Sequence, residues 1–229
     1  MTNIRYTQLA QGVVGALLTL LLVSADAGAS STSNQQLDFR VYLDDREIGY
    51  HRVKLKHSPP ATDVRVEASF DVKILFINAF RYRHQARERW NGHCLENLET
   101  QTDYGGKPLF VRSEATDNGL RVTSTEQQIT LPGCVRSYAY WDLERLRSGS
   151  LLNTQSGEHQ AVILKEQGIK PLRVGEFEIT ARSYHLETEE GTIFLWYGED
   201  QQWIGLQTRV RGNRLLSYIN EGIYVDTQS

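Results

Sequence analysis

The stretch VRVEASFDVKILF, residues 64–76, decides the fold of this chain because its side chains alternate between two classes. Apolar residues occupy every second position from Val64 to Ile74, and mostly polar residues stand between them. This period of two is typical of a β-strand with one buried and one solvent-exposed face. The pattern recurs, less regularly, in LDFRVYL (37–43), EIGYHRVKLKH (47–57) and TIFLWYG (192–198).

Turn-forming pairs separate the alternating stretches. They include Asn91-Gly92, Gly105-Gly106, Asn118-Gly119 and Gly212-Asn213. Such pairs tolerate the positive φ of tight hairpins, so neighbours in sequence should be antiparallel neighbours in space. A long sheet with one apolar face must then curl to cover that face. The sequence therefore predicts an all-β, mainly antiparallel meander that is curled into a barrel or half-barrel.

Residues 133–160 are the least strand-like part of the chain. They contain WDLERLRS (141–148), which predicts one short helix or an irregular segment. We expect the whole region to form a lid, a plug or a long connection between the two halves of the sheet.

The first segment has the features of an export signal. Arg5 precedes the apolar run Gly12–Ala25, and small residues in an A-x-A pattern follow it. We predict that residues 1–29 form a signal peptide; an uncleaved N-terminal anchor is the alternative. Residues 30–36 then form a polar lead, and residues 37–229 form a single β domain that is periplasmic or secreted.

Composition indicates a globular protein without a strong overall charge. The chain has 25 Lys+Arg and 28 Asp+Glu, which gives a net charge of -3, so we predict no nucleic-acid partner. Cys94 and Cys134 are expected to pair in an oxidising compartment and to close a loop of about 40 residues. Two buried free thiols are the alternative. Two cysteines are too few for a structural zinc site.

The stretch AFRYRHQARERWNGH, residues 79–93, has arginines on one strand face, namely Arg81, Arg83, Arg87 and Arg89. A symmetric hairpin around Ile77-Asn78 places Asp71 opposite Arg83. It also places Glu67 opposite Arg87. Arg81 and Arg89 then lack a facing carboxylate, which makes them the candidates for contact with an anion or a protein partner. The alternative is a solvated face held by ion pairs.

The other face of the same strand mixes polar and apolar groups. A two-residue turn at Asn91-Gly92 places Glu99 opposite His84. An unpaired charge in an apolar core costs several kcal/mol, so these groups predict a hydrated pocket. The alternative is that His84 and Glu99 only bond to each other at a barrel mouth. The candidate ligand-binding residues are Tyr82, His84, Glu88, Trp90, Glu99 and Trp196.

Motifs of common enzyme classes are absent from the sequence, including G-x-S-x-G, H-E-x-x-H, the Walker loop, G-x-G-x-x-G and C-x-x-C. We therefore predict no catalytic residue, no cofactor and no metal site. His51 and His57 share one strand face, and we expect them to face solvent.

The preferred function is non-enzymatic binding of an apolar or amphiphilic ligand, such as a lipid, in the concave face. The first alternative is an envelope assembly or interaction partner. The second is a hydrolase in which a carboxylate orients His84 as a base.

Four stretches together resemble a known family: IGYHRV, FRYRHQARERWNG, YWDLERLRSGSLLNTQSGE and IFLWYGEDQQWIGLQTRVRGNRLLSYI. They look like a family of secreted bacterial proteins that is described only as a domain of unknown function. The resemblance runs from about Leu37 to Tyr218. It implies a mostly-β, envelope-located single domain and brings no catalytic residues. A curled sheet behind an export signal is also similar in outline to periplasmic carriers of lipids or lipoproteins.

Overall fold

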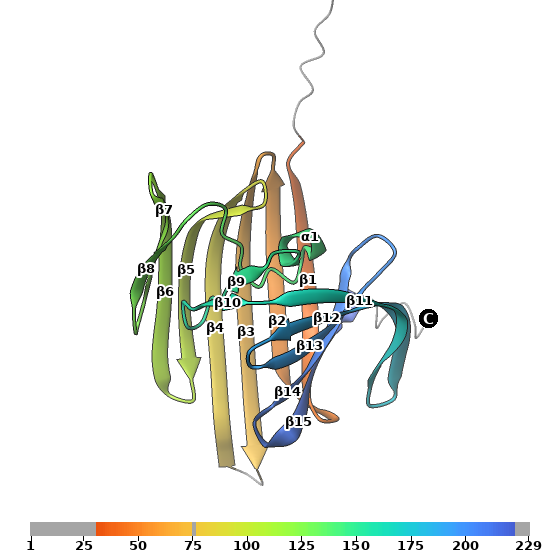
Figure 1. Cartoon of the computed structure of the whole chain (residues 1–229). Coiled ribbons are helices and arrows are strands. Elements are labelled where there is room, and N and C mark those ends of the chain that lie inside the picture. The colour runs from red at the N-terminus through yellow and green to blue at the C-terminus, as the bar shows by residue number, and fades with distance from the viewer. Residues whose placement is uncertain (1–30, 75–76, 223–229) are drawn as a thin grey trace, which may run out of the picture.

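The computed structural model describes residues 31–222 except 75–76, and shows a curled antiparallel sheet with a segment inserted into it (Figure 1). In chain order its elements are β1 (Ser33–Leu43), β2 (Arg46–Ser58), β3 (Ala61–Ile74), β4 (Ile77–Asn91), β5 (Cys94–Tyr104), β6 (Lys107–Thr116), β7 (Gly119–Ser124), β8 (Gln128–Leu131), α1 (Leu143–Leu146), β9 (Ser150–Leu152), β10 (His159–Ala161), β11 (Ile163–Val174), β12 (Phe177–Thr188), β13 (Gly191–Tyr197), β14 (Trp203–Val210), the 3₁₀ turn η1 (Arg211–Asn213) and β15 (Arg214–Asn220).

Thirteen strands of the described residues form one sheet, in the order β11-β12-β13-β14-β15-β1-β2-β3-β4-β5-β6-β7-β8. Strands next to each other in this order are antiparallel, and the one long-range junction pairs the first strand, β1, with the last, β15. Strands β11–β13 cross over the face of β2–β4 (Figure 1). The sheet order ends at β8 and β11, so the sheet curls without closing. This confirms the predicted all-β, antiparallel fold of the half-barrel type.

The segment between β8 and β11 is a plug. Its helix α1 begins after Asp142, whose side chain accepts a hydrogen bond from a backbone N–H of the first turn. Leu146, Leu151 and Leu152 have no exposed surface and pack in the main core with residues from both halves of the sheet. Among the three forms expected of this region, the structure therefore shows the plug.

A disulfide joins Cys94, at the start of β5, to Cys134, at the entry to the plug. This confirms the predicted pairing. The backbone N–H of Leu95 donates to the carbonyl of Val135 over 2.9 Å. The covalent bond and the hydrogen bond together hold the entry of the plug against β5.

The register between β3 and β4 differs from the prediction by two residues. The turn does not lie at Ile77-Asn78, because Ile74 already pairs with Ile77, and the register shifts again between Val72 and Lys73. Asp71 therefore lies opposite Arg81, and Glu67 lies opposite Gln85. A shift of two residues changes partners but keeps each side chain on its face.

The register between β4 and β5 differs in a way that matters more. The turn lies one residue later than the predicted Asn91-Gly92, because Asn91 pairs with Cys94, and the register shifts again between Arg89 and Trp90. Together these changes place Thr102 opposite His84 and Glu99 opposite Arg87. An odd shift moves a side chain to the other face of the sheet. The predicted facing pair of Glu99 and His84 is therefore wrong.

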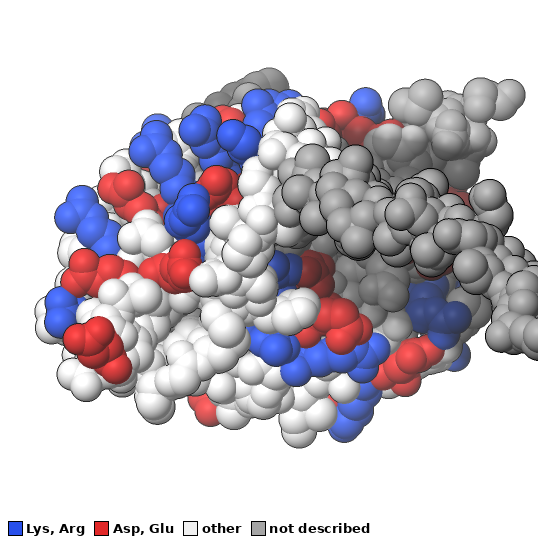
Figure 2. Space-filling view, turned by 90° about the horizontal axis from the view of Figure 1, so that it is seen from above, with Lys and Arg blue, Asp and Glu red and all other residues white. Residues whose placement is uncertain are grey.

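Residues 1–30 lie outside the described residues, and so does the predicted signal peptide or anchor. Part of the expected polar lead belongs to the sheet, since Ser33 to Gln36 pair with β2 while their side chains stay exposed. Within the described ranges, no helix is long and apolar enough to cross a membrane. Seen from above, basic and acidic side chains lie interspersed over the surface (Figure 2), as their similar numbers lead one to expect.

Shortening the side chain of Leu151 tests whether the plug contributes to the stability of the core. Leu151→Ala should lower the free energy of unfolding by about 2 to 5 kcal/mol, because the lost side chain leaves a cavity in a packed interior. Ile163→Ala is the matched control, since Ile163 is 56% exposed, and it should cost less than about 0.5 kcal/mol. Denaturant titration measures both; equal effects would contradict a plug.

Candidate functional site

The inner face of β4, turned toward the plug and β11–β15, holds four of the predicted site residues. Their exposed fractions are 7% for Tyr82, 6% for His84, 8% for Glu88 and 0% for Trp90. The structure thus has all four side chains pointing inward, as the alternation predicted. Their role as ligand contacts stays a prediction.

His84 lies in a polar row that crosses neighbouring strands. Ala68 of β3 lies opposite both His51 of β2 and His84 of β4, and Thr102 of β5 lies on the far side of His84. His84 Nδ1 and Thr102 Oγ1 are 2.8 Å apart. A hydroxyl therefore takes the place next to His84 that the sequence assigned to a carboxylate.

His51 also faces the interior, so the expectation that it faces solvent is wrong. Its ring meets three aromatic rings edge-on, those of Phe39 at 6.1 Å, Trp203 at 5.8 Å and Tyr218 at 5.4 Å between centroids. The signal for this was present in the sequence, because His51 shares the two-residue period of Val53 and Leu55, which are both buried.

Burial keeps both histidines neutral at physiological pH. It lowers the pKa of His51 to about 3, with a further contribution from the charge of His84. Burial also lowers the pKa of His84 to about 4. A neutral imidazole offers one donor and one acceptor nitrogen, so the row can bind a polar group without carrying charge.

Aromatic side chains surround the histidine row. The Phe70 ring stacks on Tyr82 with 4.9 Å between centroids, and Tyr218 lies 5.9 Å from Phe70. Tyr140 of the plug lies 5.4 Å from Trp203 of β14. This part of the interior is thus apolar in its walls, with hydroxyl and imidazole groups among them.

Some of these side chains are deep in the protein and yet incompletely covered. Burial raises the pKa of Tyr140 and of Tyr218 well above the ordinary range, so protein surrounds both. His51, Tyr140 and Tyr218 nevertheless keep intermediate exposure, and so does Val66 on the inner face of β3. These four side chains therefore keep some accessible surface on the inner side of the sheet and on the plug.

Glu88 belongs to a different cluster, which fastens the plug. Trp90 Nε1 donates to Glu88 Oε2 over 2.7 Å. The guanidinium of Arg145 in α1 lies 4.8 Å from the ring centre of Trp90 and 4.4 Å from that of Trp141. It also donates to the carbonyl of Gly92 over 2.6 Å. Burial raises the pKa of Glu88 to about 7, although the Trp90 bond and Arg145 act in the opposite direction.

Two predicted site residues lie away from this interior. Glu99 is on the outer face of β5, where its carboxylate lies 3.9 Å from Arg112. Trp196 packs on the opposite face of β13, with Leu172 and Ile204, while its neighbours in the strand join the main core. The structure therefore does not bring Glu99 or Trp196 to His84.

The outer face is the face of β1–β6 turned away from the plug. Arg81 pairs with Asp103 at 2.9 Å, and Arg89 pairs with Asp63 at 3.0 Å. The prediction that these two arginines lack a carboxylate is therefore wrong. Their role in contacts with an anion or a partner stays a prediction.

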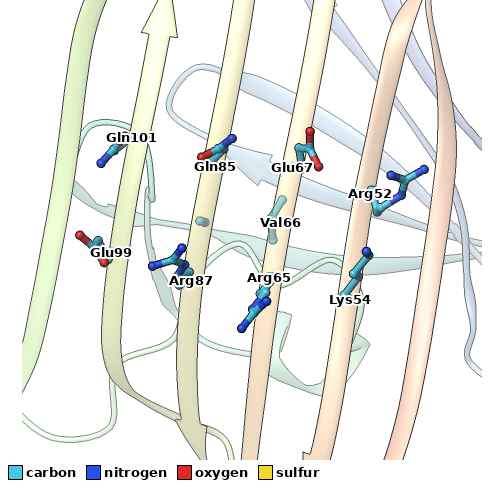
Figure 3. A pocket seen from close by; sticks show the side chains of 10 residues that line it. Arg52, Lys54, Arg65, Val66, Glu67, Gln85, Arg87, Glu99 and Gln101 are labelled. Carbon is cyan, nitrogen blue, oxygen red and sulfur yellow. The ribbon is translucent and has the colours of Figure 1, made fainter.

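A shallow depression of about 310 Å³ lies on the outer face of β2–β5 (Figure 3). A second, of about 790 Å³, adjoins it and shares Lys54, Arg65 and Arg87 with it. Both are lined mainly by charged and amide side chains. Among the described residues, no three His, Cys, Asp or Glu side chains are grouped so that they could hold a metal ion.

Comparison with known proteins agrees with this fold. Residues 39–218 match the model of a family described as a domain of unknown function, DUF6134. A crystal structure described as a beta-barrel-like protein of domain of unknown function DUF1849 from Brucella abortus is similar, with a TM-score of 0.55 and 8% identity over 82% of this chain and 94% of that chain. No curated protein matches the sequence. The resemblance to an uncharacterised, mostly-β family is confirmed, and the solved structure shows a related fold.

The neutral state of His84 predicts a pH dependence of stability. The folded pKa is about 4 and the ordinary value is 6.5, so the unfolded chain takes up a proton that the folded protein resists. The free energy of unfolding should fall as the pH drops from 6.5 to 4, by about 3 kcal/mol from this ring. His84→Gln keeps a hydrogen-bonding partner for Thr102. In this variant the free energy of unfolding should fall by about 3 kcal/mol less between neutral and acid pH, as measured by denaturant titration at pH 7.5 and pH 4.5.

His57→Gln is the control, because His57 is an exposed ring on the same strand face as His51. Glu88 acts in the opposite sense. Its folded pKa of about 7 lies above the ordinary value of 4.5, so its burial destabilises the protein as the pH rises. That contribution is common to wild type and variants and cancels in the comparison. Equal acid sensitivity of wild type and His84→Gln would show that His84 is not held neutral in the fold.

Proposed function

Since the chain belongs to the DUF6134 family, a domain of unknown function, we propose its function from the geometry: it binds an amphiphilic ligand, without converting it, between the inner face of β2–β4 and the plug. The observation that supports this proposal is that His51, Tyr140 and Tyr218 keep intermediate exposure although protein packs closely enough around them to shift their pKa values. Ligand sites are usually apolar spaces with a few polar groups at fixed positions.

The chemistry of the wall suits a ligand with an apolar part and a small polar part. Val66, Tyr140 and Tyr218 keep accessible apolar surface, and burial of a ligand against such surface contributes about 25 cal/mol per Å². His51 and His84 offer neutral donors and acceptors for a hydroxyl, ester or protonated carboxyl group. A charged headgroup would lie at the edge of the site, because the interior holds no free cation near the two histidines in the described residues.

The surroundings of His84 speak against a hydrolase. A base of this kind needs a carboxylate that orients the imidazole, and the neighbour of His84 is the hydroxyl of Thr102. Glu88, the nearest inward carboxylate along β4, is bonded to Trp90 instead. These contacts favour binding over catalysis.

Export is part of the proposal. The apolar run behind Arg5 and the small residues that follow it support a signal peptide. The disulfide between Cys94 and Cys134 supports an oxidising compartment. We therefore assign the mature protein to the periplasm or to the secreted fraction.

Enlarging Val66 tests the proposed site. Val66→Phe places a ring next to His51 and should weaken binding of a fluorescent amphiphile such as N-phenyl-1-naphthylamine by more than about tenfold. Because the ring enters existing space, the melting temperature should change little. A filled interior would instead make the same variant unstable by about 1 to 3 kcal/mol.

Gln85→Phe is the control, because Gln85 lies on the outer face of the neighbouring strand β4. It should leave probe binding unchanged. The proposal fails if wild type does not bind the probe, or if Val66→Phe and Gln85→Phe bind it equally well.

An envelope assembly role is a second candidate, favoured by strand β11 at the end of the sheet order. Ile163 and Ile169 of this strand are 56% and 58% exposed, and an unpaired edge with apolar side chains can add a partner strand. A photo-crosslinker at position 169 should then trap one discrete protein in cells. A crosslinker at position 121, on the outer face of β7, serves as the control.

A further inference from the structure

The outer face carries a row of basic residues that face one another across three strands. Lys54 of β2 lies opposite Arg65 of β3, and Arg65 lies opposite Arg87 of β4. Residues directly opposite in antiparallel strands have Cβ atoms about 5 Å apart, and like charges at that distance destabilise the sheet. The Lys54–Arg65 and Arg65–Arg87 neighbours therefore cost stability in the protein alone, and Glu99 opposite Arg87 offsets only part of that cost.

Four other arginines of this face have ion-pair partners. Ion pairs join Arg52 to Asp38, Arg81 to Asp103, Arg83 to Asp71 and Arg89 to Asp63. Arg65 and Arg87 have no ion pair with any described residue. Arg65 and Arg87 thus form, with the ammonium of Lys54, a group of cations without an ion pair among the described residues, and the exposed Lys56 extends it along β2.

The acids nearest to the row have other partners. Glu67 accepts a hydrogen bond from the hydroxyl of Tyr50 over 2.7 Å. Glu99, opposite Arg87 in the register, lies 3.9 Å from Arg112 on its other side. Both carboxylates line the same depression as the row, yet neither closes an ion pair with Arg65 or Arg87.

The depression supplies room for an anion beside these cations. Figure 3 shows Arg65 and Arg87 on adjacent strands with Gln85 next to them. Its volume of about 310 Å³ accommodates a tetrahedral oxyanion with some of its water. Gln85 and Gln101 in the lining offer amide N–H donors in addition to the guanidinium groups.

We propose that Lys54, Arg65 and Arg87 form a binding site for a compact phosphate-type dianion. Two guanidinium groups can each give paired N–H bonds to phosphate oxygens, and the ammonium adds a third charge. The ligand is compact because the flanking arginines are already paired and the whole chain has a net charge of -3, which gives no extended positive field for a polymer or a membrane. This site lies on the face of the sheet opposite to the proposed amphiphile site and does not depend on it.

The test uses the double variant Arg65→Gln/Arg87→Gln and the control Arg81→Gln, which removes an ion-paired arginine of the same strand face. Isothermal titration with sodium phosphate at low ionic strength should show binding by wild type and by the control. The double variant should bind at least about tenfold more weakly, because it loses both guanidinium forks.

Stability provides an independent readout. Without phosphate, the double variant should melt at the same or a higher temperature than wild type, because it lacks the facing like charges. Phosphate should raise the melting temperature of wild type and of Arg81→Gln, and sodium chloride at equal ionic strength should not.

Three outcomes would overturn the proposal. One is equal binding of phosphate by wild type and the double variant. Another is an equal loss in Arg81→Gln, which would indicate general surface charge. The third is binding to vesicles of phosphatidic acid and phosphatidylcholine without binding to free phosphate, which would indicate a membrane surface in place of a compact site.

Discussion

The constraint on which the structure depends is that one continuous sheet must cover its own apolar face. Alternation gives every long strand such a face, and the meander alone would leave it open to water. The pairing of β1 with β15 brings the second half of the sheet across the first. The leucines of the plug pack in the core between the halves. The sheet therefore reaches a packed interior without the closed hydrogen-bonding of a barrel.

Curling requires local departures from regular strands, and β2 shows one. The register with β1 shifts next to Gly49, so that Ile48 is an extra residue. Gly49 has a φ of 153°, and a Cβ there would overlap the carbonyl oxygen of Ser69 in β3. A bulge of this kind bends the strand and increases its twist, which contributes to the curl of the sheet. Only glycine permits β2 and β3 to approach so closely.

The plug is held by polar groups as well as by apolar packing. Arg145 lies between the rings of Trp90 and Trp141, pairs with Asp142 and donates to the carbonyl of Gly92. These contacts reduce the cost of burying a guanidinium, although Arg145 Nε has no hydrogen-bond partner among the described residues and burial lowers the pKa of Arg145 to about 10. Glu88, bonded to Trp90, belongs to the same arrangement. The inner face of β4 thus has two roles along its length, with anchoring of the plug at one end and the histidine row at the other.

The sequence predicted the features that follow from alternation with a period of two. It did not predict the strand registers at positions where a bulge or a turn interrupts that alternation. The inward side chains of β4, the meander and the curl all follow from alternation. The shift between Arg89 and Trp90 has no signature in the pattern, so Glu99 was placed inward and Thr102 was missed. The shift near the β3–β4 turn misassigned the partners of Arg81 and Arg87 in the same way. Trp196 was misplaced for another reason, since β13 is buried on both faces and alternation does not distinguish them.

The same alternation links the two proposed sites. Val66 and His84 face the interior, and their strand neighbours Arg65 and Gln85 face the outer depression. A change of register by one residue would move the apolar set outward and the basic row inward, at the cost of a buried charge. The strong preference of the core for one register therefore also fixes the arginine row in place, in spite of its repulsion. A sheet with one buried face can in this way keep mutually repelling cations together on its solvent-exposed face. Binding of an anion there would reduce the repulsion.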